Sequence, residues 1–315
     1  MFNDNINLIQ SKLNKDLKAI YTSGPKSLVD TFNYVICGEG KRVRPLLTIL
    51  TSESLFEDFQ KSYNAALAIE ILHNFTLVHD DIMDDDSIRH GKETVHKKWD
   101  NSTAILTGDL MLAKSLKILS DSNYNSKIMK SFNSALVAVC EGQALDKEFE
   151  TLESISENDY FNMIEKKTSN LIAMPIEIGA LAYDYPDEKC NALFEYGLNI
   201  GKAFQINDDY LEIISSANVM QKSLDSDIVL GKKTYPIILC NDIDKNFIND
   251  LKNNSNNIKD IINDLRIFIQ SHEIDKEIKN TVDNFYQIAN KLIDNINFKN
   301  NKLTDFVNLL KKRQK

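Results

Sequence analysis

An apolar helix that runs into a cluster of carboxylates is the feature that most constrains how this chain folds. The stretch EILHNFTLVHDDIMDDDSIRHG, residues 70–91, places five aspartates within seven residues. Residues four apart share one face of an α-helix, so Asp80 and Asp84 can point the same way, and His73 lies on that stripe two turns earlier. Carboxylates this close repel each other and resist ionisation. A divalent cation removes the conflict, and hard oxygen donors without a nearby cysteine suit Mg²⁺. A solvated acidic helix end is the ordinary interpretation of such a segment, but the apolar flank and a second acidic cluster downstream favour the metal site.

The composition indicates a mostly helical, intracellular protein. Only ten glycines and five prolines interrupt 315 residues, few for a sheet protein, and apolar residues recur at helical spacing between them. The formal net charge of −9 argues against a nucleic-acid partner. The start of the chain lacks the apolar core of a signal peptide, and no apolar run approaches the roughly 18–20 residues of a membrane span. The four scattered cysteines show neither zinc nor CxxC spacing, which fits a cytoplasmic protein.

A cluster of cations follows the Gly38-Glu39-Gly40 break between two expected helices. The segment Lys41-Arg42-Val43-Arg44-Pro45 places three positive charges before an apolar helix, with the proline suited to a helix start. Helix N-termini and arginine side chains both bind phosphate, so this junction is a candidate anion site. A solvated basic loop is an equally good interpretation of the segment alone.

A second apolar helix, residues 197–213, repeats the acidic pattern. Gly197 and Gly201 are spaced for close approach to another helix. One face carries Gln205, Asp208, Asp209 and Glu212. Cations and carboxylates then mix across an expected loop that contains Lys222, Asp225, Asp227, Lys232, Lys233 and Thr234. Two acidic stripes with isolated cations describe a metal-bridged polyphosphate site, and no Walker loop or dinucleotide fingerprint offers a different phosphate chemistry.

These motifs resemble those of the trans-isoprenyl diphosphate synthases, the polyprenyl synthetase family that includes farnesyl and geranylgeranyl diphosphate synthases. Residues 80–84, DDIMD, resemble the family's first aspartate-rich motif, DDxxD, and residues 208–212, DDYLE, resemble its second. The GEGKRVRP segment, EGQALD, the Lys167-Thr168 pair and FQINDDYL stand in the family's order. The joint order is far more specific than any motif alone, and it extends from Gly38 to Pro236.

The resemblance implies a single all-α domain over residues 1–315 with the isoprenoid synthase fold, in which helices surround a deep central cavity. It implies a prenyltransferase that condenses isopentenyl diphosphate with an allylic prenyl diphosphate. About three Mg²⁺ ions per active site and a homodimer are expected on the same ground. No nucleic acid and no membrane span is expected to take part.

The same resemblance assigns roles to individual residues. The expected metal ligands and their supporting carboxylates are Asp80, Asp81, Asp84, Asp208, Asp209, Asp227 and Glu212. The allylic diphosphate is expected at Arg89, Lys167, Lys222 and Lys232. Isopentenyl diphosphate is expected at Lys41, Arg44 and His73, with His90 nearby. Lys167, Thr168 and Gln205 are the catalytic candidates, expected where positive charge develops. Asp85 and Asp86 are interpreted as solvated charges at the start of a loop.

The expected chemistry suits these residue types independently. Departure of diphosphate from an allylic carbon separates two charges, and a metal with fixed cations stabilises the leaving anion. The allylic cation survives only in an apolar cavity that excludes water, where the isopentenyl double bond attacks it. No protein nucleophile is needed, so the lack of a serine or cysteine triad is no objection.

Three residues depart from the family pattern. His90 follows Arg89 where the family usually has a second arginine, and a neutral imidazole would hold phosphate less firmly. Glu212 replaces the last aspartate of the second motif, which keeps the charge and adds a methylene. Asp225 stands where the family often has glycine. We expect activity to be retained, because the first carboxylates of both motifs are present.

Product length is expected to depend on the residues four and five before the first motif, Thr76 and Phe75. An aromatic side chain at the farther position resembles enzymes that make C20 chains, and some that make C15 chains. Geranylgeranyl diphosphate is therefore the expected product and farnesyl diphosphate or a longer polyprenyl diphosphate the alternative. An ordinary core role for Phe75 stays open, because ideal helix geometry puts it about 140° from Asp80.

Two other classes of protein stay open. A terpene cyclase would share the first acidic motif and the helical cavity, but the Lys41–Arg44 segment and His73 would then have no second diphosphate to bind. A regulatory subunit of a heteromeric synthase would be expected to lack the acidic motifs, and both are present.

Overall fold

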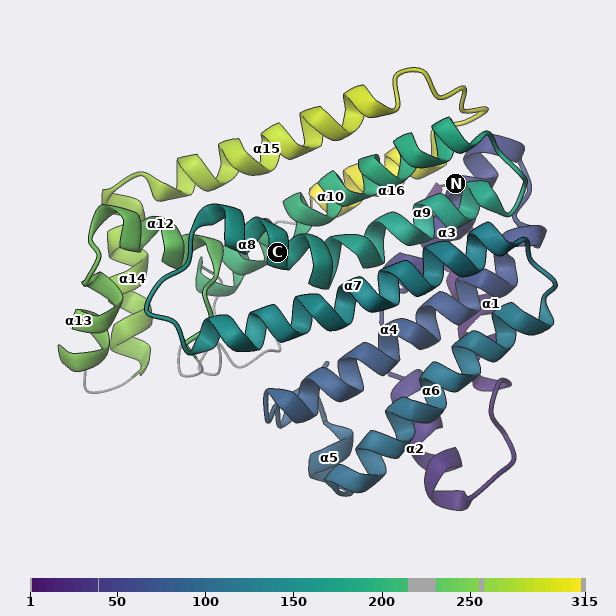
Figure 1. The fold of residues 1–315 in the computed structure, drawn as a ribbon, viewed down its shortest axis with the longest axis horizontal. Helices are drawn as coiled ribbons and strands as arrows, with labels where there is room; N and C mark the ends of the chain where they lie inside the picture. The colour runs from purple at the N-terminus through teal and green to yellow at the C-terminus, as the bar shows by residue number, and fades with distance from the viewer. Residues whose placement is uncertain (1, 39, 215–230, 255–257, 313–315) are drawn as a thin grey trace. The chain divides into compact units, whose positions relative to one another are not determined.

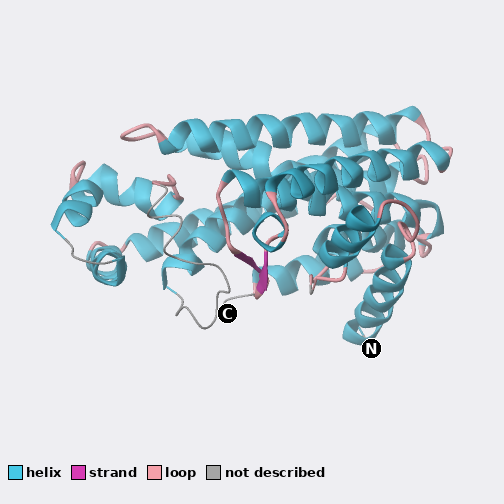
Figure 2. Cartoon of the chain, turned by 90° about the horizontal axis from the view of Figure 1, so that it is seen from below, coloured by secondary structure: helices cyan, strands magenta, loops and turns pink. Residues whose placement is uncertain are grey.

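Helices make up nearly all of the regular structure (Figure 2). The computed structural model describes residues 2–38, 40–214, 231–254 and 258–312. Within these ranges the strands form one antiparallel hairpin, in which β1 (Ile88–Arg89) pairs with β2 (Lys92–Glu93). The all-α class predicted from the sequence is therefore confirmed.

The chain forms two compact units, each assembled from separated segments. The first consists of Met1–Ser134, Met174–Phe194 and Asn295–Asn308, and the second of Ala135–Ala173, Glu195–Asp294 and Leu309–Lys315. The helices that contribute residues to both are α7 (Ser126–Glu150), α9 (Asn170–Leu181), α10 (Asp187–Ile214) and α16 (Lys302–Lys311). The expectation of a single domain stays a prediction.

The first unit is organised around α4 (Tyr63–Met83), the helix that ends in the first aspartates. Its neighbour α6 (Asn101–Asp121) lies alongside it (Figure 1). Gly108 on α6 leaves room for the imidazole of His79 on α4, because a Cβ there would lie 2.2 Å from its Nε2. The other elements are α1 (Phe2–Lys18), α2 (Lys26–Ile36), α3 (Val43–Phe56), η1 (Gln60–Ser62) and α5 (Val95–Lys98).

The second unit contains the second acidic helix, α10, and the turn that carries Lys167. α8 (Glu157–Ile164) begins with a capping box, in which Ser156 and Asp159 satisfy each other's backbone N–H groups. It runs into a π-helical turn, η2 (Glu165–Ser169), and then into α9. The remaining helices are α12 (Tyr235–Ile243), α13 (Phe247–Asn254), α14 (Ile258–Ser271) and α15 (Ile274–Leu292).

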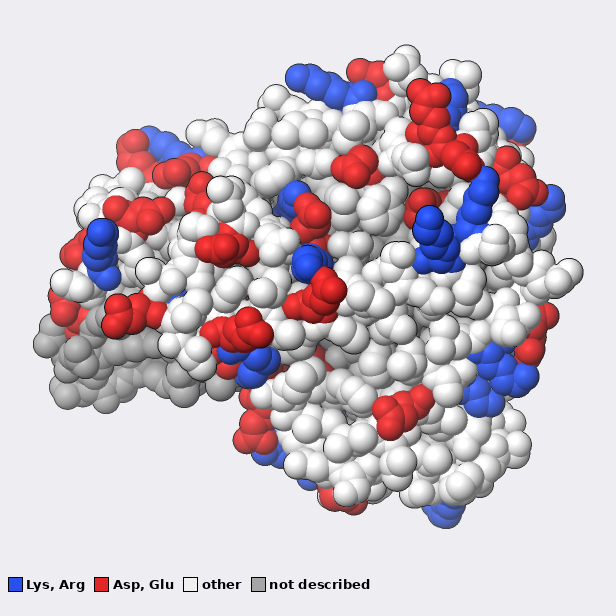
Figure 3. Space-filling model, in the orientation of Figure 1, with Lys and Arg blue, Asp and Glu red and all other residues white. Residues whose placement is uncertain are grey.

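The surface carries charges of both signs. On the face drawn in Figure 3, acidic and basic side chains are interspersed among uncharged ones. Of the helices in the described ranges, none combines the length and the hydrophobicity needed to cross a membrane.

Candidate active site

The first aspartates lie at the C-terminal end of α4 and in the turn that follows. Asp84 caps the helix: its backbone N–H donates to the carbonyl of Asp80 at 2.9 Å. The carboxylate of Asp84 is buried and that of Asp80 is half-buried. The four-residue spacing therefore places Asp80 in the last turn of α4 and Asp84 at its C-cap, and their shared role as metal ligands stays a prediction.

Asp81 occupies a different environment from Asp80 and Asp84. Its Oδ1 accepts a hydrogen bond from Nε of Arg89 at 2.5 Å, and the residue is 5% exposed. Burial raises the pKa of the Asp81 carboxyl to about 7, although the Arg89 charge acts in the opposite direction. Asp81 therefore holds Arg89 in place, and its role in a metal shell stays a prediction.

Arg89 also binds Asp86, through Nη2 and Oδ2 at 2.9 Å. The Asp86 side chain is only 17% exposed, so its interpretation as a solvated charge is wrong. Asp85, in contrast, is 79% exposed and pairs with Lys97. The difference arises because the hairpin folds Arg89 back over Asp86, a contact between its strand and the preceding turn that the sequence pattern did not reveal.

His90 lies in the turn of that hairpin. Both turn residues have positive φ, 50° for His90 and 73° for Gly91, which is the two-residue turn that suits the twist of a hairpin. Histidine tolerates this backbone region better than β-branched residues do. His90 is exposed, and its contribution to phosphate binding stays a prediction.

The predicted isopentenyl diphosphate residues Arg44 and His73 are in direct contact. Nη1 of Arg44 lies 3.0 Å from Nε2 of His73. Arginine can only donate, so Nε2 must accept and the proton of a neutral imidazole must sit on Nδ1. Burial lowers the pKa of His73 well below 6.5, and the charges of Arg44 and Arg89 add to the effect. Among the described residues, Nδ1 of His73 has no hydrogen-bond partner although it is buried.

The second unit brings the three catalytic candidates to adjacent helices. The Thr168 hydroxyl donates to Oε1 of Gln205 at 2.8 Å, and Nε2 of Gln205 donates to Oδ1 of Asp209 at 2.7 Å. Oδ2 of Asp209 accepts from the Tyr160 hydroxyl at 2.7 Å and from the Tyr235 backbone at 3.2 Å. The sequence predicted Thr168 and Gln205 together, but nothing in its spacing predicted Tyr160.

The π-helical turn η2 is fixed from two sides. On one side α7 contributes Gly142, where a Cβ would lie 2.3 Å from the backbone nitrogen of Lys167. On the other side α10 contributes Gly201, where a Cβ would lie 2.4 Å from Cα of Ser169. Single π turns inside helices often mark functional sites. The predicted role of Gly201 in close helix approach is confirmed. So is that of Gly197, where a Cβ would lie 2.4 Å from Cα of Ala173.

Ion pairs complete the fixation of η2. Nζ of Lys167 bonds Oδ2 of Asp146 on α7 at 2.5 Å, and Lys166 pairs with Glu141 on the same helix at 2.5 Å. Asp146 is the last residue of the EGQALD segment, which the sequence singled out without giving Asp146 a role. Its position three residues from Gln143, on one helix face, was the available signal.

The structure describes some of the other predicted ligands but not all of them. Asp208 and Glu212 lie on α10, both half-buried, and Lys232 lies just before α12. Lys222, Asp225 and Asp227 lie outside the described residues. Within the described ranges no group of three or more histidine, cysteine, aspartate or glutamate side chains is gathered as a metal site. The first acidic motif belongs to the first unit and the second acidic motif to the second.

The predicted chain-length residues, Phe75 and Thr76, lie in the second half of α4. Phe75 is 8% exposed and packs edge to face on His79, with ring centroids 4.8 Å apart. The Thr76 hydroxyl donates to the carbonyl of His73 in its own helix at 2.8 Å. Both positions agree with a packing role, and their effect on product length stays a prediction.

A family model described as polyprenyl synthetase matches residues 25–266. The chain belongs to this family. Geranylgeranyl diphosphate synthase of Methanosarcina mazei is 41% identical to this polyprenyl synthetase over 225 residues, which are 70% of this chain and 69% of the relative. Geranylgeranyl diphosphate synthase of Sulfolobus acidocaldarius is 34% identical over 307 residues, 92% of this chain and 93% of the relative. Relatives named geranylfarnesyl diphosphate synthase also match.

Solved structures support the same assignment. The crystal structure of geranylgeranyl pyrophosphate synthetase from Pyrococcus horikoshii superimposes on this polyprenyl synthetase with a TM-score of 0.88 at 29% sequence identity, covering 98% of this chain and 97% of the other. The resemblance stated from the motifs and the isoprenoid synthase fold are therefore confirmed. So is the class of enzyme, because the matched relatives are named as prenyl diphosphate synthases.

The donor set of this polyprenyl synthetase fits a divalent cation. Asp80, Asp84, Asp208 and Glu212 offer carboxylate oxygens, which are hard ligands of the kind that Mg²⁺ prefers. Both oxygens of Asp209 accept hydrogen bonds from protein groups, and its role in a metal shell stays a prediction.

Proposed function

We propose that this polyprenyl synthetase condenses isopentenyl diphosphate with an allylic prenyl diphosphate and releases an all-trans prenyl diphosphate longer by five carbons. The observation that carries the proposal is the contact between Arg44 and His73. These side chains form a candidate anion site on α3 and α4, and α4 also carries Asp80 and Asp84 at its end. An enzyme with one diphosphate substrate would have no use for that second anion site.

The geometry of His73 supports this use. Its Nε2 accepts from Arg44, and its Nδ1–H is a buried donor without a partner among the described residues. A buried donor without an acceptor is costly, so a phosphate oxygen that reached Nδ1 after a movement of the ring would satisfy it. Arg44 and Lys41 would supply charge to the same diphosphate.

In the reaction, the bond between C1 of the allylic substrate and its diphosphate oxygen breaks, and the diphosphate leaves with the electron pair. A new carbon–carbon bond forms between C1 and the terminal alkene carbon of isopentenyl diphosphate. The positive charge then lies on the other alkene carbon of isopentenyl diphosphate. The methylene next to that carbon loses a proton, and the new allylic double bond forms between the two. In the first unit Asp80 and Asp84 would hold Mg²⁺, and in the second unit Asp208 and Glu212 would; the chemistry that the bound metal would supply is neutralisation of charge on the departing diphosphate.

The chain's own residues contribute positioning and charge. Lys167 is held by Asp146 and would hold the allylic diphosphate. The Thr168 hydroxyl and the Gln205 amide are aligned by Asp209, and their oxygen atoms would stabilise positive charge at the reacting carbon. The apolar cavity that the family resemblance implies would exclude water from the cation.

Geranylgeranyl diphosphate is the proposed product, supported by the names of the relatives and by Phe75 on α4. About three Mg²⁺ ions per active site, a homodimer and a cytoplasmic location belong to the same proposal.

The test is incorporation of radiolabelled isopentenyl diphosphate with C5, C10 or C15 allylic primers, with products sized by chromatography. We expect Mg²⁺-dependent elongation that EDTA abolishes and added Mg²⁺ restores. Asp84→Asn should lower turnover by at least about a hundredfold, because it removes a charged ligand. The matched variant Asp85→Asn changes an exposed neighbour and should retain activity. No incorporation with any primer would refute the proposal.

The terpene cyclase alternative makes the opposite prediction in the same assay. A cyclase consumes the allylic diphosphate when isopentenyl diphosphate is left out, whereas the proposed synthase needs both substrates. Turnover of a primer alone to a hydrocarbon or alcohol product would favour the cyclase.

A further inference from the structure

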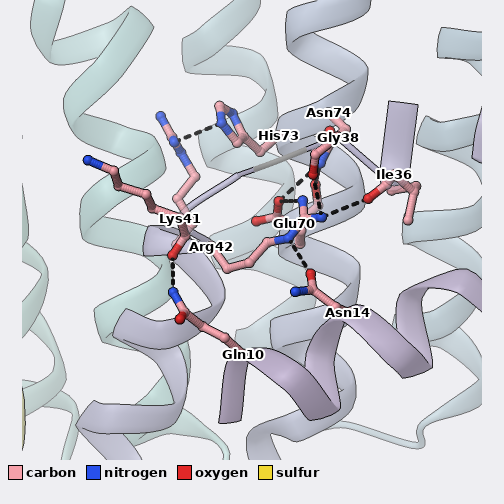
Figure 4. Close-up of polar contacts among 10 residues, drawn as sticks. Gln10, Asn14, Ile36, Gly38, Lys41, Arg42, Glu70, His73 and Asn74 are labelled. Atoms are coloured by element: carbon pink, nitrogen blue, oxygen red, sulfur yellow. Dashed lines mark hydrogen bonds and ion pairs between the residues drawn. The ribbon is translucent and has the colours of Figure 1, made fainter. Parts of the chain in front are cut away.

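Arg42 stands between two predicted ligands of isopentenyl diphosphate, Lys41 and Arg44, but its side chain is buried away from solvent. The residue is 6% exposed. Figure 4 shows the Lys41 and Arg42 side chains leaving the backbone in opposite directions, with Arg42 reaching toward Glu70. The three cations of this segment therefore lie in different environments, and Arg42 does not share the surface on which the diphosphate is expected.

The guanidinium of Arg42 is bonded through all three nitrogens. Nη1 pairs with Oε1 of Glu70 on α4 at 2.7 Å, and Nε donates to Oδ1 of Asn14 on α1 at 2.9 Å. Nη2 donates to the carbonyls of Ile36 at 2.7 Å and Gly38 at 3.1 Å, at the end of α2. Arg42 is the residue that precedes α3, and its side chain thus connects the start of that helix to α1, the end of α2 and α4 (Figure 4). Lysine, with a single charged nitrogen, could not reproduce this fork.

The loop backbone is shaped around that guanidinium. Arg42 itself has φ of 52° and ψ of 40°, a left-handed conformation that is unfavourable for a side chain of this size and requires support from its surroundings. Gly40 passes so close that a Cβ there would lie 3.3 Å from Nη1. The carbonyl of Lys41 in turn accepts from Nε2 of Gln10 on α1 at 2.8 Å. Lys41 and Arg42 are therefore both anchored to α1.

Glu70 and His73 lie on the same helix. Glu70 lies one helical turn before His73 on α4, and Asn74 donates to its carboxylate at 3.2 Å. Because Glu70 balances the charge of Arg42 in a buried pair, Arg42 adds little to the positive field at Lys41 and Arg44. Its contribution to the site is geometric.

We infer that Arg42 is a positioning residue for isopentenyl diphosphate, which fixes the Lys41 and Arg44 side chains opposite His73 through its bonds to Glu70, Asn14 and the end of α2. The inference rests on the proposed function. It predicts a specific effect on one substrate: loss of the network should weaken isopentenyl diphosphate binding and leave allylic diphosphate binding and saturated turnover unchanged.

Two variants remove the network in different ways. Arg42→Met combined with Glu70→Met replaces a buried ion pair by apolar side chains of similar length, an exchange that folded proteins often accept. Asn14→Ala removes a single bond from the partly buried face of α1 and leaves the ion pair intact. Asn7→Ala is the matched control, because Asn7 is exposed on the same helix two turns earlier.

The measurement is KM for each substrate with the other saturating, together with kcat. We expect KM for isopentenyl diphosphate to rise about tenfold in the double variant and about threefold in Asn14→Ala, with KM for the allylic primer and kcat within about twofold of wild type. Asn7→Ala should match wild type. Equal rises in both KM values, or no rise in either variant, would show that Arg42 serves folding alone.

Amide hydrogen exchange supplies a readout that does not depend on activity. A peptide covering residues 36–44 should exchange faster in Asn14→Ala than in Asn7→Ala, and unchanged exchange would overturn the inference even if the double variant failed to fold. Failure of the wild-type protein to incorporate isopentenyl diphosphate is a separate result, which would refute the proposed function and not the network.

Discussion

The buried hydroxyl of Tyr160 donates a 2.7 Å hydrogen bond to Oδ2 of Asp209, the second carboxylate of the second acidic motif. Oδ1 of Asp209 accepts a hydrogen bond from the Gln205 amide, and Oε1 of Gln205 accepts one from the Thr168 hydroxyl. The Tyr160 phenol is therefore one end of a chain of hydrogen bonds that ends at Thr168. A residue with no place in the acidic motifs thereby orients two of the catalytic candidates.

Tyr160→Phe should lower kcat by about tenfold with little change in either KM, because hydrogen bonds to charged groups contribute on the order of 1.5–3 kcal/mol. The loss would act on the alignment of Gln205 and Thr168 and not on substrate binding. Steady-state rates at saturating substrates measure it.

Tyr63→Phe is the control for that substitution. It also removes a tyrosine–carboxylate hydrogen bond, from Tyr63 to Asp16 at 2.8 Å, but both residues belong to the first unit, whereas the second motif belongs to the second. An equal fall in kcat for both variants would mean that the effect is general destabilisation.

His73 should make the stability of the protein pH-dependent. Burial lowers its pKa well below the ordinary 6.5, so the unfolded chain binds a proton between those two values and the folded chain does not. Stability from this group is therefore complete above about pH 6.5 and falls as the pH drops through the window below it.

The comparison is chemical denaturation of wild type and His73→Leu at pH 7.5 and pH 5.5. Wild type should lose up to about 1.4 kcal/mol more than the variant across this interval, since one pH unit below the unfolded pKa corresponds to about that energy. All other groups are identical in the two proteins, so their contributions to the pH dependence cancel. An identical pH dependence in the two proteins would mean that His73 is not held neutral.

Local periodicity was sufficient to predict the helices and the stripes on them. Asp80 and Asp84 on α4, and Gln205 with Asp209 on α10, follow from spacings of four residues along one helix. Close approach at Gly197 and Gly201 was also predictable, because a small residue repeated every turn leaves a smooth helix face.

The missed contacts connect residues far apart in the sequence. Arg42 and Glu70 are 28 residues apart, Lys167 and Asp146 21 apart, and Tyr160 and Asp209 49 apart. No pattern within one element specifies which charged side chain will become buried opposite another. The π turn was equally invisible, because the sequence EKKTS contains no glycine or proline to mark it.

Phe75→Ala should lengthen the product if the ring limits the space available to the growing chain. The substitution removes a buried side chain that packs on His79, so a loss of about 3–5 kcal/mol in stability is also expected. Chromatography of the products at a temperature where the variant is folded would then show chains beyond C20.

Phe132→Ala provides the control for that loss. Phe132 is fully buried in α7 and has no expected role in product length, so its variant should be destabilised with the wild-type product distribution. An unchanged distribution in Phe75→Ala would leave Phe75 as an ordinary core residue.

Gly142→Ala should impair catalysis by displacing η2. The added methyl would lie 2.3 Å from the backbone nitrogen of Lys167, and backbone atoms cannot move aside as a flexible side chain can. We expect kcat to fall by at least about tenfold, since small displacements of positioned groups are costly to catalysis.

Gly197→Ala separates this effect from helix packing in general. Its methyl would meet Cα of Ala173 at 2.4 Å, a clash of similar severity between α10 and α9 and one helical turn from the Gly201 contact with η2. Thermal denaturation should show a comparable loss of stability for both variants, while kcat per folded molecule falls much further in Gly142→Ala. If kcat fell equally in the two, the position of η2 would not be what limits turnover.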